Sequence, residues 1–159
     1  MRGGLLEPQQ SSRSNRQVAG MSTWKRLAIQ LFPERNVGLD AFRRPHMSIY
    51  QVFFKLKKDG EVYIQTGNQE GLARIFKFVE WCFAQRNRNW DIWNAAATAF
   101  LEHLADDDES AAIIPLWVKP DIFLEMENEF KKRRERDGEG KFQKLLEEYN
   151  RHNSTDFQY

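Results

Sequence analysis

The chain has 159 residues, of which 41% are hydrophobic and 30% are charged, and its formal net charge is +1. These proportions are ordinary for a water-soluble globular protein long enough to bury its own core. The only cysteine, Cys82, excludes an intramolecular disulfide and fits a reducing compartment. No stretch approaches the roughly 18 to 20 uninterrupted apolar residues of a membrane span, and no secretory signal is present. We therefore expect a cytoplasmic protein without a membrane partner.

The first segment, residues 1–20, is rich in Gly, Ser, Gln, Asn and Arg and has little to bury. We expect a disordered extension, with Met21 as a possible natural start. From Ser22 onward, apolar residues recur at the i, i+3, i+4, i+7 spacing of an α-helix. Residues 21–159 are accordingly predicted to form a single helical domain.

The first predicted helix follows Ser22 or Thr23 and stops at Pro33. A second predicted helix follows Ser48 over residues 48–58. This segment also alternates, and the Asp59-Gly60 pair could make a β-hairpin within residues 48–64. We favour a helix there, because the surrounding segments are helical and a lone hairpin is marginally stable.

The next two predicted helices follow the capping residues Asn68 and Asn89. The third is apolar on nearly all sides and should be central. The fourth runs through the F-L-E-H-L motif that ends at Leu104. Further on, a fifth helix opens at Pro120 and ends near Gly138, and a sixth contains Phe142 and its apolar neighbours. The fold class is therefore all-α, a compact bundle or short stack of about six amphipathic helices.

Charge is segregated along the chain. Residues 21–77 carry ten Lys or Arg and five Asp or Glu, which gives 10 − 5 = +5, whereas residues 78–110 carry two and seven, which gives 2 − 7 = −5. The acidic part contains a run of four acids, Asp106, Asp107, Asp108 and Glu109. It lacks the alternation and the glycine of a calcium loop, so we expect no metal there. It could instead steer a basic partner to this surface.

No common hydrolytic or nucleotide-binding motif occurs in the chain. The histidines are too scattered to suggest a metal site. On a helical wheel Glu102 and His103 face different ways, which argues against an acid–base pair. Glu80 lies in the nearly all-apolar third helix, where a structural partner is more plausible than catalysis. We expect no catalytic residues, no cofactor and no enzymatic activity.

The helix pair between Ile75 and Leu104 reads I-F-K-F-V-E-W-C-F and then W-N-A-A-A-T-A-F-L-E-H-L. It resembles a family of small bacterial all-α proteins, with F-x-E-W in one helix and N-A-x-x-x-x-F-L-E-H-L in the next, over residues 24–130. Such proteins resemble the immunity partners of polymorphic toxins. The motif residues are Phe78, Glu80, Trp81, Asn94, Phe100, Leu101, Glu102, His103 and Leu104. The resemblance implies a non-enzymatic, toxin-binding domain.

We therefore expect an immunity protein that neutralises a cognate bacterial toxin with a basic active-site cleft by occluding it. The predicted contact residues are the acids Glu102, Asp106, Asp107, Asp108 and Glu109, with the aromatic anchors Trp90, Trp117 and Tyr50. The alternative is a nucleic-acid-associated or regulatory module that uses basic residues such as Arg43, Arg44 and Lys131–Arg134. The pI near 7.9 and the core spacing of the aromatics argue against that alternative.

Overall fold

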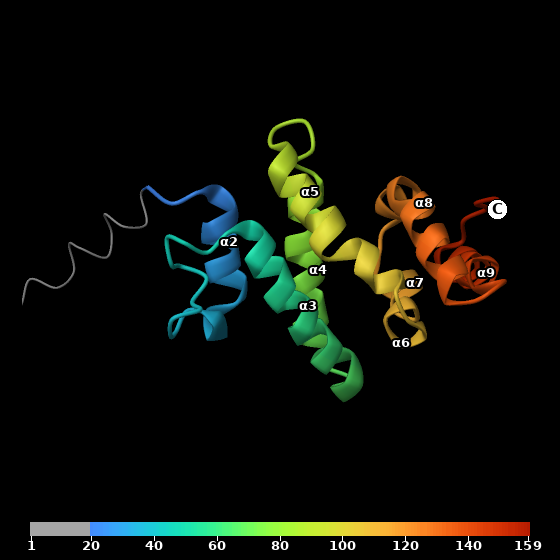
Figure 1. The fold of residues 1–159 in the computed structure, drawn as a ribbon, viewed down its shortest axis with the longest axis horizontal. Coiled ribbons are helices and arrows are strands. Elements are labelled where there is room, and N and C mark those ends of the chain that lie inside the picture. Colours follow the sequence, from blue (N-terminus) through green and yellow to red (C-terminus); the bar gives the residue numbers. More distant parts are fainter. Residues whose placement is uncertain (1–19) are drawn as a thin grey trace, which may run out of the picture.

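The computed structural model describes residues 20–159 as helices joined by short turns and by one longer connection, residues 36–48 (Figure 1). Apart from Gly20, the extension expected at residues 1–20 lies outside the described residues. In chain order the elements are α2 (Thr23–Leu31), the 3-10 helix η1 (Pro33–Arg35), α3 (Ile49–Thr66), α4 (Gln69–Phe83), α5 (Trp90–Ala99), the 3-10 helix η2 (Leu101–Ala105), α6 (Asp108–Ala111), α7 (Ile114–Trp117), α8 (Pro120–Asp137) and α9 (Lys141–Asn153). Residues 20–159 contain no strand, so the expected all-α fold is confirmed.

The segment that could have formed a hairpin is one long helix, α3. Ser48 begins it with a capping box: its hydroxyl accepts from the Gln51 N–H at 3.2 Å, and the Gln51 side chain accepts from the Ser48 N–H at 2.8 Å. Gly67 ends the helix with a left-handed φ of 66°. Gly60 lies inside the helix, buried at helical spacing from Leu56. The prediction of a helix is therefore confirmed.

A short turn at Gly67 folds α4 back alongside α3 (Figure 1). Asn68 caps α4 by accepting from the Gly71 N–H at 2.9 Å. Gly71 is needed for a second reason, because a Cβ at this position would lie 2.6 Å from two ring carbons of Tyr63. The missing side chain at Gly71 thus lets the end of α3 approach the start of α4.

One helix boundary differs from the prediction. The fourth predicted helix ends at Ala99, and the F-L-E-H-L motif continues as the 3-10 helix η2. Phe100 leaves the helical conformation with φ −134° and ψ −68°. Just before it, the Thr98 hydroxyl donates to the Asn94 carbonyl at 2.8 Å, an interaction that bends helices. Phe100 and Leu101, the two residues at the break, are both buried.

The buried side chains form one cluster that extends from α2 to α9. Figure 1 shows α2 at one end of the long axis and α8 with α9 at the other. At this second end the Tyr149 ring of α9 stacks on Phe123 of α8, with 3.8 Å between ring centroids. Its hydroxyl donates to the Val118 carbonyl at 2.7 Å. Helix α9 is thereby part of the core and not a loose appendage.

Candidate functional site

Most of the acidic run proposed as a docking surface is engaged within the molecule. Glu102 accepts from Arg133 of α8 at 2.6 Å, and Asp106 binds the other terminal nitrogen of the same guanidinium. The Arg133 side chain is only 16% exposed. A cation this deep needs its counter-charges, so the two carboxylates hold α8 against η2.

Asp108 is engaged in the same way. It binds Arg134, whose side chain is 4% exposed, and Lys141 of α9, whose Nζ lies 3.0 Å from Oδ1. Asp137 completes the group, at 3.2 Å from Arg134 and 2.6 Å from Lys141. Hydrogen bonds from Lys141 and Arg134 hold the pKa of Asp108 below its usual range. We call the whole group the charged latch, which consists of Glu102, Asp106, Asp108, Arg133, Arg134, Asp137 and Lys141.

The remaining two acids of the run have different roles. Asp107 is the N-cap of α6, and its carboxylate accepts from the Ser110 N–H at 2.8 Å. Glu109 is exposed and forms no ion pair with any described residue. Within residues 20–159, Glu109 is therefore the acid of this run that remains most available to a partner.

The carboxylate that is hydrogen-bonded to His103 is that of Asp106 and not that of Glu102, because the expected α-helix is a 3-10 helix at this point. Residues three apart eclipse one another in a 3-10 helix, which places His103 Nδ1 2.7 Å from Asp106 Oδ2. His103 Nε2 lies 3.9 Å from Glu102. Partial burial alone would raise the pKa of Asp106, but hydrogen bonds from His103 and Arg133 outweigh it and hold that pKa below its usual range.

A carboxylate beside an imidazole is an arrangement used in general acid–base catalysis. Here the same carboxylate, Asp106, also neutralises Arg133. Glu80, the other candidate acid, forms a separate ion pair with Lys119 at 2.7 Å. The structure thus gives Glu80 and His103 different charge partners.

The sequence analysis did not identify the cationic partners of the acidic run. Arg133, Arg134 and Lys141 follow it by 24 residues or more, so helical spacing gives no indication of the pairing. The available signal was the occurrence of an acidic run and a basic run in one short chain. Opposite runs of this kind can neutralise each other once the chain folds.

Two of the three predicted aromatic anchors are half-buried and make contacts within the molecule. Trp117 stacks on Phe76 of α4, with 5.6 Å between ring centroids. The Tyr50 hydroxyl of α3 accepts from the Asn94 side chain of α5 at 2.9 Å. Both side chains pack against the core. On α7 the neighbouring Leu116, and not Trp117, is the exposed residue.

Trp90, the third predicted anchor, is 57% exposed at the start of α5. Its ring centroid lies 6.0 Å from that of Trp93, which is half-buried against Phe83. The Arg86 guanidinium lies over the Trp93 ring at 4.8 Å and pairs with Glu125 of α8. We call this surface the tryptophan edge, which consists of Arg86, Arg88, Trp90 and Trp93.

Hydrogen bonds order the turn that carries the tryptophan edge. Asn89 caps α5 by accepting from the Ile92 N–H at 3.3 Å. Its own N–H donates to the Gln85 carbonyl at 2.8 Å, and the Gln85 side chain donates to the Trp81 carbonyl at 3.0 Å. In Figure 1 the turn between α4 and α5 stands at the top of the view. The exposed indole is thus carried by an ordered turn.

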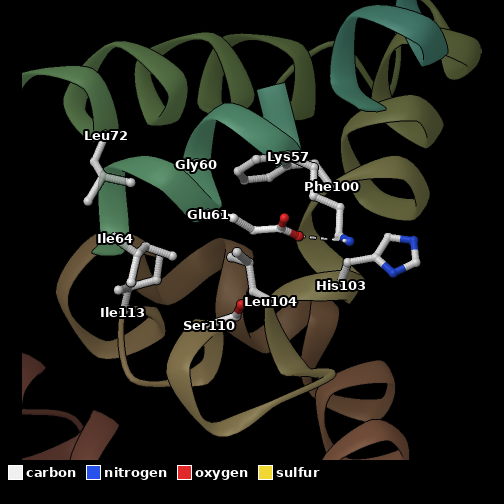
Figure 2. A pocket seen from close by; sticks show the side chains of 10 residues that line it. All are labelled: Lys57, Gly60, Glu61, Ile64, Leu72, Phe100, His103, Leu104, Ser110 and Ile113. Atoms are coloured by element: carbon white, nitrogen blue, oxygen red, sulfur yellow. Dashed lines mark ion pairs between the residues drawn. The ribbon is translucent and has the colours of Figure 1, made fainter. Parts of the chain in front are cut away.

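A small pocket lies between α3, α4, η2 and α6 (Figure 2). Apolar side chains line most of it, and the Lys57–Glu61 ion pair, at 3.2 Å, lies across one side. Figure 2 shows the His103 ring directed away from the other lining side chains. The cavity measures about 20 Å³, which is room for about one water molecule. A protruding surface is therefore a better candidate site than this pocket.

Residues 20–159 contain neither a cluster of metal ligands nor a helix able to span a membrane. No three His, Cys, Asp or Glu side chains converge to hold a metal ion. None of the helices described combines the length and apolar character needed to cross a bilayer.

The sequence model of one protein family, a domain of unknown function (DUF7674), matches residues 25–133, and the chain belongs to this family. The match includes the tryptophan edge and the acidic run and ends inside α8. No curated protein and no solved structure matches the chain.

Proposed function

We propose that this member of the DUF7674 family is an immunity protein, which binds a cognate bacterial toxin in the cytoplasm and blocks the toxin's active or substrate site. The observation that carries the proposal is the exposed indole of Trp90 beside Trp93 and Arg86. Trp and Arg are enriched among the few residues that dominate protein interfaces. The resemblance of the helix pair to immunity proteins supports this class of partner.

The way in which Trp90 is presented favours a protein partner. A side chain held on an ordered turn loses little conformational freedom when it enters a partner's pocket. Around it, the exposed side chains of Arg88 and Asp91 can form the polar rim that surrounds an interface anchor.

The charged latch moves the centre of the proposed contact away from the acidic run. A toxin that took Asp106 or Asp108 for its own cations would have to break the ion pairs that these acids form with Arg133 and Arg134, whose side chains are nearly buried. We therefore place the toxin on the tryptophan edge. Glu109 remains as an acid that can contribute to steering a basic partner.

A second candidate is single-stranded nucleic acid at the same edge. Bases stack on exposed aromatic rings while arginines follow the phosphates, and Arg88 lies two residues before Trp90. Such binding would weaken steeply with added salt.

To test the proposal, tagged protein captures partners from its own cells, and each captured protein is identified, purified and expressed for toxicity. Wild type and the Trp90→Ala variant are then compared for binding and for rescue of growth. Phe54→Ala is the matched control, because Phe54 is an aromatic of similar exposure, 52%, on α3.

We expect wild type and Phe54→Ala to bind one toxic protein and restore growth, and Trp90→Ala to bind it more weakly and to restore less growth. A non-toxic partner, or neutralisation by Trp90→Ala equal to wild type, would contradict the proposal. Recovery of nucleic acid whose binding is lost in Trp90→Ala would favour the second candidate.

A further inference from the structure

The most exposed large apolar side chains of the described residues lie in one turn, between η1 and α3. Val37 is 74% exposed and Leu39 is 81% exposed. They flank Gly38, whose φ of 84° reverses the backbone in the left-handed region. Single exposed aliphatic residues are common, but two at one turn form an apolar tip that calls for an explanation.

This turn is braced on both sides. At its start the Asn36 side chain donates to the Ile29 carbonyl of α2 at 3.0 Å. At its end Asp40 pairs with Lys55 of α3 at 3.3 Å. Across its centre Arg44 Nε donates to the Gly38 carbonyl at 3.3 Å. The apolar tip is therefore preformed, and an arginine lies directly beside it.

The surroundings of the tip carry positive charge without matching acids. Lys25, which is buried, donates to the Arg44 carbonyl at 2.7 Å, and burial lowers its pKa. Arg43 and Arg44 are exposed. None of the three forms an ion pair with an acid in residues 20–159. The nearby acids are already used, since Glu34, Asp40, Asp59 and Glu61 each pair with another cation.

Figure 1 shows α2 and the following turns at one end of the molecule, opposite α8 and α9. We propose that this end docks on the surface of an anionic phospholipid bilayer. Val37 and Leu39 enter the boundary between headgroups and acyl chains, while Arg43 and Arg44 bind lipid phosphates. One ligand thereby accounts for both the exposed aliphatic side chains and the unmatched cations.

A bilayer fits this tip better than an acidic protein does. A protein would need a preformed pocket for the two side chains, whereas a fluid bilayer accepts a protruding apolar tip without one. The sequence-based expectation of no membrane partner rested on the lack of a spanning segment. Peripheral docking requires no such segment.

The test is flotation of the full-length protein with vesicles of phosphatidylcholine, alone or mixed with phosphatidylserine. Two variants probe the two components of the surface: Val37→Ser with Leu39→Ser, and Arg43→Gln with Arg44→Gln. Val62→Ser is the matched control, because Val62 is an exposed aliphatic residue, 53%, on α3. Circular dichroism checks that each variant remains folded, which is expected because the substituted side chains are exposed.

We expect wild type and Val62→Ser to float with the phosphatidylserine vesicles and not with phosphatidylcholine alone. The serine variant should bind at least about tenfold more weakly, because two aliphatic side chains no longer leave water. The arginine variant should float less with the phosphatidylserine vesicles, because it no longer binds the lipid phosphates through Arg43 and Arg44.

Two results would overturn the proposal: failure of wild type to float with anionic vesicles, or equal flotation of wild type and the serine variant. Binding to polyglutamate or single-stranded DNA that depends on Arg43 and Arg44 but not on Val37 and Leu39 would also overturn it, in favour of a general anion site. Neither result bears on toxin binding, which we place on the tryptophan edge.

Discussion

The charged latch and the tryptophan edge both combine charged residues with exposed positions, yet the fold uses them in opposite ways. In the latch, Arg133 and Arg134 are nearly buried and their carboxylate partners come from η2 and α6. At the edge, the charges lie around Trp90, which is 57% exposed. A run of charge is thus weak evidence for an interface, whereas an exposed indole on an ordered turn is stronger evidence.

We therefore expect the charged latch to contribute to stability and the tryptophan edge to contribute to binding. Changes in the latch should alter the free energy of unfolding, and changes at the edge should alter affinity for the partner. The four predictions below test that separation, from the largest expected effect to the smallest.

Arg133→Ala should lower the free energy of unfolding by about 3 kcal/mol, because it removes the nearly buried cation that Glu102 and Asp106 share and leaves Asp106 with His103 and the exposed Arg136. Denaturant unfolding followed by circular dichroism measures this loss. A triple variant, Glu102→Gln, Asp106→Asn and Arg133→Met, should recover much of it, since neutral side chains leave no unpaired charge. Equal stability of wild type and Arg133→Ala would show that the latch does not hold the fold.

Trp90→Ala should weaken partner binding by about 2 kcal/mol, or roughly 30-fold, if Trp90 is the interface anchor. Its unfolding free energy should stay within about 0.5 kcal/mol of wild type, because the side chain is largely exposed. Calorimetric titration and denaturant unfolding on the same samples give both values. A loss of unfolding free energy as large as the loss of binding free energy would show that Trp90 contributes to stability as well as to binding.

Acid should destabilise the latch. A carboxyl whose pKa is lower in the folded than in the unfolded protein stabilises the fold above the unfolded value, and this stabilisation is lost as pH falls through the folded value. The pKa of Asp106 is lowered in this way, so stability should decline as pH falls below about 4. Thermal unfolding of Asp106→Asn should show a flatter decline over this range. Parallel curves for the variant and wild type would exclude Asp106 as a source of acid sensitivity.

Glu109→Gln should have the smallest effect, with stability within about 0.5 kcal/mol of wild type, because this side chain is exposed and unpaired within the described residues. Its association rate with a basic partner is the informative quantity, measured by stopped-flow at two salt concentrations. A slower rate at low salt only would show that the acidic run still steers the partner. An unchanged rate would limit the run to its structural role.

Helical periodicity predicted the helices well, because each buries one face and begins at a recognisable cap such as Ser48, Asn68 or Asn89. It failed at Phe100, where the backbone leaves the helical conformation and the chain continues as the 3-10 helix η2. Helical periodicity could not predict pairing between distant charges such as Asp108 and Lys141, because residue spacing relates only neighbours on one helix. Trp90 is exposed, as expected. Tyr50 and Trp117 are partly buried by packing between helices, which residue spacing does not predict.

The match to the family ends at residue 133, in the last turn of α8, and the end of that helix and α9 continue the same core. A shortened fragment made to the family limits, residues 25–133, would separate Arg133 from Arg134 and remove the ring of Tyr149 from Phe123. The apolar side of α8 would then face water, and such newly exposed surface promotes aggregation. For anyone preparing this protein, the unit to express therefore extends through α9.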